Sequence, residues 1–146
     1  MKQRLYIKQV CVALLLAMPT TVVAQGAVPP GHPPIKAPKM TAEEALKEAP
    51  KADTSLASLD KAFKETETKL KKSPKDAKAK KAYVDACYKY GHQAMVNGSK
   101  SPRILYRAAL ALYRRALKVD PKHQPSLDDK KTIEDIYQTM PGGIPK

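Results

Sequence analysis

The segment from Ser101 to Val119 restricts the possible folds more than any other part of the chain. We expect one helix here, because Pro102 suits the first helical position after a Ser cap and Asp120-Pro121 ends the run. At about 100° per residue, two adjoining arcs of this helix are apolar, namely Leu105, Ala108, Ala109, Leu112 and Ala116, and Tyr106, Leu110, Tyr113 and Leu117. A helix that is apolar over most of its circumference packs between neighbours. The segment therefore predicts an inner helix of an all-α fold.

The composition and the flanking segments favour the same fold class. The chain has no Trp and one Phe, while Ala and Lys, which favour helices over strands, are abundant. Apolar residues recur at helical spacing from Asp53 to Lys72, where Ser73-Pro74 ends the run. Further helices are expected from Asp76 to Val96, ended by Asn97-Gly98, and from Pro125-Ser126 to Met140.

The first 24 residues have the pattern of a secretory signal peptide. Three basic side chains precede an uninterrupted apolar run over residues 10–18, and small residues end at Ala24, so cleavage is expected between Ala24 and Gln25. The run is shorter than the ~20 residues that span a bilayer, which makes a retained transmembrane anchor the weaker alternative. We expect the mature protein to be exported, either to the periplasm or to the medium.

Residues 25–53 are expected to form a flexible, disordered Pro-rich linker. Residues 25–40 contain five prolines, which favours an extended spacer, with a docking peptide for a partner as the alternative. Thr41 and Glu44 match a capping box, but the short helix they would start contains few apolar residues and meets Pro50. The predicted helical domain therefore covers residues 54–140, and residues 141–146 form a tail.

Residues 109–121 resemble the second helix of a tetratricopeptide repeat. The two small residues Ala109 and Ala116, the aromatic Tyr113 and the closing Pro121 match that motif. The weaker resemblance of the flanking helices extends it to residues 54–140, although the connection over residues 97–102 is longer than the usual turn. The resemblance implies a short array of antiparallel helical hairpins that binds a protein or peptide in a concave groove lined mainly by first helices.

The resemblance also implies which side chains face that groove. The positions carried over to this chain are Lys78, Lys81, Asp85, Tyr88 and Lys89, and they cluster on one side of a helical wheel, opposite Ala82, Tyr83, Ala86 and Tyr90. A second basic ridge is expected on the following helix, at Arg103, Arg107 and Arg114. The acidic Asp85 argues against a clamp for a peptide's terminal carboxylate, because like charges repel.

The net charge of +13 predicts attraction to anions in general, without indicating which kind. Removal of residues 1–24 takes away three basic and no acidic side chains, which leaves +10. We expect an acidic protein or peptide, and the alternative is an anionic envelope surface of lipid or polysaccharide. The lysine-rich stretch over residues 69–81 is either a generic anion patch or a solvated loop. Nucleic acid is not expected, because the protein is exported and this stretch lacks aromatic side chains for stacking.

The sequence contains no motif that indicates catalysis, so we expect a binding protein and not an enzyme. His32, His92 and His123 are scattered, whereas a metal site needs three or four convergent ligands. No metal or cofactor is therefore expected. Cys11 would leave with the signal peptide, and Cys87 is expected to be a buried apolar residue, with a redox or intermolecular thiol as the alternative.

Overall fold

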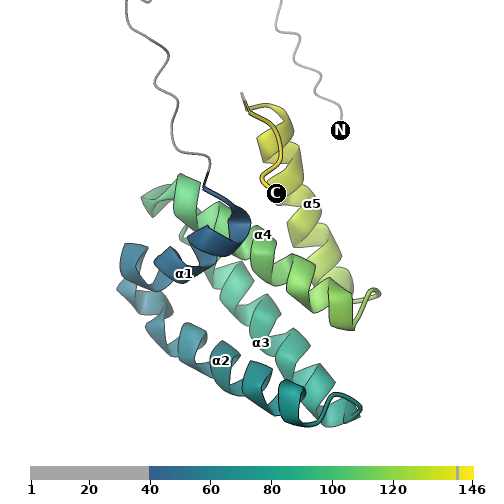
Figure 1. Ribbon diagram of the computed structural model, residues 1–146. Helices are drawn as coiled ribbons and strands as arrows, with labels where there is room; N and C mark the ends of the chain where they lie inside the picture. Colours follow the sequence, from purple (N-terminus) through teal and green to yellow (C-terminus); the bar gives the residue numbers. More distant parts are fainter. Residues whose placement is uncertain (1–39, 141) are drawn as a thin grey trace, which may run out of the picture. The chain divides into compact units, whose positions relative to one another are not determined.

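The computed structural model describes residues 40–140 and 142–146, and this part of the chain is all-helical (Figure 1). The elements are α1 (Ala42–Ala52), the short 3-10 helix η1 (Thr54–Leu56), α2 (Ala57–Lys72), α3 (Ala77–Val96), the 3-10 helix η2 (Gly98–Lys100), α4 (Pro102–Val119) and α5 (Gln124–Gln138). The predicted signal peptide, with Ala24 and Gln25, and residues 25–39 of the predicted linker lie outside the described residues. Within the described ranges, none of the helices combines the length and the apolar character needed to cross a membrane.

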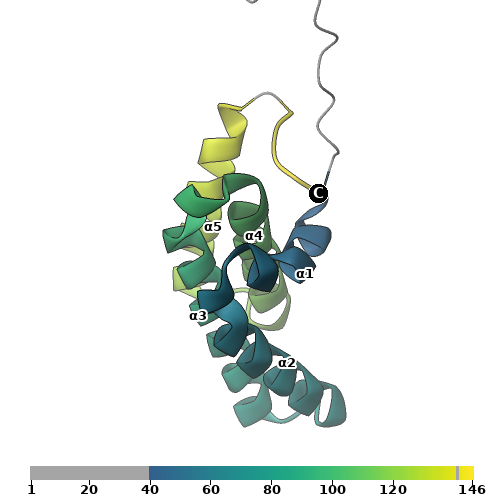
Figure 2. The same ribbon diagram turned by 90° about the vertical axis from the view of Figure 1, so that its left-hand side faces the viewer.

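The helix α4 is the central element of the fold, as its apolar pattern predicts. It packs against α1, α3 and α5, and Figure 2 shows α1 and α5 on opposite sides of it. Eight of its side chains are buried, namely Leu105, Ala108, Ala109, Leu110, Ala111, Leu112, Tyr113 and Ala116. Because three neighbours cover α4, most of its two apolar arcs is buried, and only Tyr106 and Leu117 stay half-buried. This helix therefore contributes the largest share of the core.

The helix α1 corrects the predicted boundary of the linker. Thr41 and Glu44 form the expected capping box, with Thr41 Oγ1 accepting from the Glu44 amide at 3.2 Å. The helix then continues past Pro50 to Ala52 and packs on α4 through Ala42, Ala45, Leu46 and Ala49, which are all buried. The prediction fails because alanines contribute little apolar pattern, yet they let two helix backbones approach closely. Residues 41–53 therefore belong to the folded unit and are not part of a linker.

The remaining helices begin and end close to their predicted positions. Asp76 caps α3 by accepting from the Lys78 amide at 2.8 Å, and Asn97 ends this helix. Ser101 precedes α4 but makes no side-chain capping bond, so Pro102 carries the start signal. The helix α5 begins at Gln124 with a proline in its first turn, slightly earlier than predicted.

A second part of the core lies between α2 and α3. The Phe63 ring lies 5.8 Å from that of Tyr83 and 6.2 Å from that of Tyr90, and the Arg115 guanidinium lies 5.5 Å above it. Cys87 is completely buried in this layer, and burial raises the pKa of its thiol to about 12. The prediction that Cys87 is a buried apolar residue is confirmed, and at neutral pH its thiol is protonated and unreactive.

A buried carboxylate joins the connection after α1 to the connection after α3. Asp53 accepts hydrogen bonds from the Ser55 hydroxyl at 2.7 Å, from Asn97 Nδ2 at 2.7 Å and from Lys100 Nζ at 3.0 Å. The Ser55 hydroxyl first and the Lys100 ammonium second hold the pKa of Asp53 at about 2. The bonds from Asn97 and Lys100 span more than 40 residues and form only in the folded chain, so the ionised carboxylate favours folding.

The Asp53 cluster predicts a specific dependence of stability on pH. Because the folded-state pKa lies below the unfolded value, the stabilisation is complete above about pH 4 and is lost as the pH falls through about 2. The variant Asp53→Asn should therefore be less stable than the wild type at pH 7 and should approach it at pH 2. Urea unfolding at a series of pH values measures this difference.

The matched control is Glu65→Gln, which changes an exposed carboxylate on α2. The difference between its urea midpoint and that of the wild type should stay constant from pH 7 to pH 2. A deficit of Asp53→Asn that is equally large at both pH values would show that the ionised carboxylate does not provide the stabilisation.

Candidate functional site

The predicted groove lysines lie on an exposed face of α3. Lys78, Lys81 and Lys89 are all exposed, and Lys81 Nζ pairs with Asp85 Oδ2 at 2.9 Å. Asp85 is half-buried, and this pair fixes the one acidic side chain among the three lysines. The structure therefore brings these four predicted positions together.

Tyr88 does not share the exposure of these lysines. Its ring lies 5.5 Å from that of His123, 5.6 Å from that of His92 and 6.3 Å from that of Tyr113. These partners come from α3, α4 and the turn before α5, so Tyr88 is a half-buried packing residue. The sequence of α3 alone could not predict this packing role, because Tyr113 and His123, which cover Tyr88, come from other segments.

The three arginines of the predicted ridge have three different environments. Arg103 is exposed at the start of α4. Arg107 turns inward and donates from Nη1 to the Met40 backbone oxygen next to α1. Arg114 is half-buried, with Nη2 at 4.0 Å from Glu134 Oε1 of α5. They share a helix face, as expected, but only Arg103 is exposed, because Met40 and Glu134 engage the other two.

The largest concentration of positive charge lies where α2 ends and α3 begins. We call this surface the lysine end, and its members are all exposed: Lys69, Lys71, Lys72, Lys75, Lys78, Lys80 and Lys81. Only Lys71, with Glu67 at 3.0 Å, and Lys81 have ion-pair partners in the described part of the chain. Residues 69–89 contain eight lysines and two aspartates, a net charge of +6, whereas residues 40–146 together carry +8.

A shallow hollow of about 400 Å³ opens in the lysine end. It is lined by Lys69, Lys72, Ser73, Asp76, Lys78, Ala79 and Ala82. Ala82, which the helical wheel groups with the buried side of α3, is in fact exposed here. Lysine ammonium groups around two alanine side chains form a surface that can accept an acidic side chain together with an apolar neighbour.

A hydrogen-bonded cluster at the other end of α3 was not predicted from the sequence. Asp129 of α5 accepts from the Tyr113 hydroxyl at 2.9 Å, and His92 Nδ1 lies 2.9 Å from the same carboxylate oxygen. Burial first and the Asp129 charge second raise the pKa of Tyr113. His123 pairs locally with Ser126 at 2.8 Å. The cluster fastens α3, α4 and α5 to one another, and its residues lie too far apart in sequence for any local pattern to reveal it.

The described residues contain no group of three or more His, Cys, Asp or Glu side chains placed to hold a metal ion. Comparison of the chain with models of protein families, with curated protein sequences and with solved structures gives no significant match. The function is therefore inferred from the charges and contacts of this chain.

Proposed function

We propose that this protein is an interaction module that binds an acidic protein or peptide through the lysine end and the adjoining face of α3. The main contacts are Lys78, Lys81 and Lys89, with Asp85 as a fixed acidic neighbour. The observation that carries the proposal is the charge distribution, since one segment of 21 residues holds +6 of the +8 on residues 40–146. Such a concentration attracts acidic partners and orients them.

The shape and the mixed charges of this surface favour a polypeptide over a uniform anionic surface. The hollow beside Lys78 has alanine side chains in its lining, and Asp76 and Asp85 lie between the lysines. A flat layer of lipid head groups would meet these carboxylates as well as the lysines. An acidic peptide can place its carboxylates beside the lysines and its apolar atoms in the hollow.

We also propose a fold type and a cellular location for this protein. The contacts of α2 with α3, α3 with α4 and α4 with α5 support a short array of helical hairpins of the tetratricopeptide type. The pattern of residues 1–24 supports export, with action in the periplasm or outside the cell. The N-terminal residue of the protein purified from its native source tests the second statement, since export with cleavage predicts Gln25.

The binding proposal is tested by reversing charges on α3. The triple variant Lys78→Glu, Lys81→Glu, Lys89→Glu should bind a fluorescent acidic peptide, such as a run of alternating Glu and Leu, at least about tenfold more weakly than the wild type. The loss arises because three attractive contacts become repulsive ones. The affinity is measured by fluorescence anisotropy near 0.15 M salt. At this concentration, exposed charges farther apart than about 8 Å are largely screened, so the close contacts dominate.

The matched control reverses three exposed lysines outside this surface, Lys47, Lys61 and Lys122. It has the same net charge as the test variant, so a purely global effect would weaken both equally, and that result would refute the proposal. Vesicles containing phosphatidylglycerol provide the second probe. If the protein bound the vesicles but not the peptide, its partner would be an anionic membrane surface and not a protein.

A further inference from the structure

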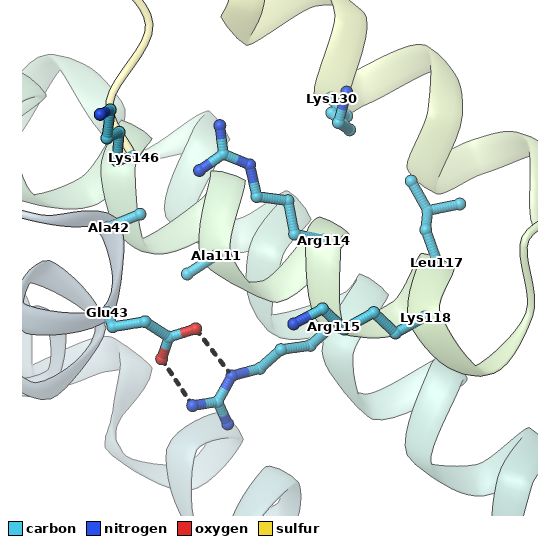
Figure 3. A pocket seen from close by; sticks show the side chains of 9 residues that line it. All are labelled: Ala42, Glu43, Ala111, Arg114, Arg115, Leu117, Lys118, Lys130 and Lys146. Atoms are coloured by element: carbon cyan, nitrogen blue, oxygen red, sulfur yellow. Dashed lines mark hydrogen bonds and ion pairs between the residues drawn. The ribbon is translucent and has the colours of Figure 1, made fainter.

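A second basic site lies where α1, α4, α5 and the tail residues 142–146 meet (Figure 3). It is a pocket of about 400 Å³ lined by Ala42, Glu43, Ala111, Arg114, Arg115, Leu117, Lys118, Lys130 and Lys146. Figure 3 shows Arg114, Arg115 and Lys118 on α4, with Lys130 on α5 and Lys146 on the tail. The Ala42 amide donates to the Lys146 backbone oxygen at 3.0 Å, which holds Lys146 at the start of α1.

One of the five cations is neutralised within the fold. Arg115 donates from Nη2 to Glu43 at 2.6 Å, and its Nη1 donates to Glu67 at 3.0 Å. These carboxylates, with that of Glu43 acting first, raise the pKa of Arg115 above its usual value. Arg115 therefore serves as a permanent structural link between α1, α2 and α4, and a ligand would have to displace Glu43 to reach it.

The other cations outnumber their acidic partners. Glu134 accepts from Lys130 Nζ at 2.7 Å and lies 4.0 Å from Arg114, so these two cations share one carboxylate. Lys118 and Lys146 have no ion-pair partner among the residues that the structure describes.

The positions of these charges favour a bound anion over simple solvation. The side chain of Arg114 is only 31% exposed and its carboxylate partner is 4.0 Å away, so it has lost hydration without gaining a close ion pair. An anion in the pocket would restore the lost interactions, because charge-assisted hydrogen bonds are stronger than neutral ones. The apolar lining residues Ala42, Ala111 and Leu117 can contact an organic group attached to the anion.

We propose that this pocket binds a small organic molecule through a phosphate group. A phosphate monoester has three acceptor oxygens and about −1.5 to −2 charges at pH 7, so it can engage Arg114, Lys118 and Lys146 together, whereas a carboxylate has two oxygens and about half the charge. The planar guanidinium of Arg114 suits two phosphate oxygens, and Lys118 and Lys146 act as point charges. The site is independent of the lysine end and of the acidic partner proposed for it.

Binding is tested with inorganic phosphate and phenyl phosphate at constant ionic strength, adjusted with sodium chloride. Amide resonances of residues 42–43, 111–118 and 130 should shift in a saturable way in NMR titrations. Phenyl phosphate should bind more tightly than inorganic phosphate, because its ring contacts Leu117. The absence of saturable shifts with both probes, or tighter binding of succinate than of phenyl phosphate, would overturn the proposal.

Single substitutions separate this pocket from the rest of the basic surface. Lys118→Gln should weaken phenyl phosphate binding about tenfold, and its fold should be unaffected because Lys118 is exposed and makes no ion pair among the described residues. Arg114→Lys keeps the charge but loses the planar donor pair, so it should also weaken binding. The control Lys78→Gln, on the lysine end, should leave the affinity unchanged. An equal loss of phenyl phosphate affinity in Lys78→Gln would mean that the probe is held only by the general positive charge, and this would overturn the pocket proposal. Such a result would not affect the proposal of peptide binding at the lysine end.

Discussion

Replacement of Leu112 by Ala is expected to lower the free energy of unfolding by about 3 kcal/mol. Leu112 is 0% exposed on α4, the helix that contacts α1, α3 and α5. The substitution removes apolar atoms from the core and leaves a cavity that three packed neighbours cannot easily close. Urea unfolding followed by far-UV circular dichroism measures the change.

The matched control for this substitution is Leu127→Ala on α5. Leu127 is 37% exposed, so its truncation should lower the free energy of unfolding by about 1 kcal/mol, well below the loss at Leu112. If both substitutions cost the same, α4 would not be the central helix of the core.

Replacement of Ala45 by Asp is expected to detach α1 from the rest of the fold. Ala45 is 0% exposed on the face of α1 that packs against α4, and an aspartate there would bury an unpaired charge. We expect a loss of about 3 kcal/mol or more in the free energy of unfolding, limited by the total contribution of α1. Urea unfolding measures the loss, and limited proteolysis should reveal new cleavage within residues 42–52.

The control Lys47→Asp introduces the same residue on the exposed face of α1. It carries the same helix-propensity cost and should lower the free energy of unfolding by no more than about 1 kcal/mol. Equal protease sensitivity of the two variants and the wild type within residues 42–52 would mean that α1 is not docked. Residues 41–53 would then behave as the linker that the sequence pattern predicts.

The positively charged residues illustrate how far a sequence pattern can locate a site. Lys78, Lys81 and Lys89 are exposed on one face of α3, as their spacing predicts, because lysines on an uncovered helix face stay in water. Arg107 and Arg114 also have the spacing of an exposed ridge, yet Met40 and Glu134 engage them from distant parts of the chain. The pocket at Arg114 could not be predicted, since its lining comes from α1, α4, α5 and the tail.

The all-helical class, the central position of α4 and the ends of α3 and α4 could be predicted from the sequence. These properties follow from helical periodicity, the Asp76 cap, Pro102 and Asn97, which act within a few residues of the chain. The folded structure was needed to show that α1 docks through alanines, that Tyr88 packs against His123 and that five cations meet at one pocket. Each of these depends on contacts between segments far apart in sequence, and local propensity and periodicity carry no information about which distant surface covers a given side chain.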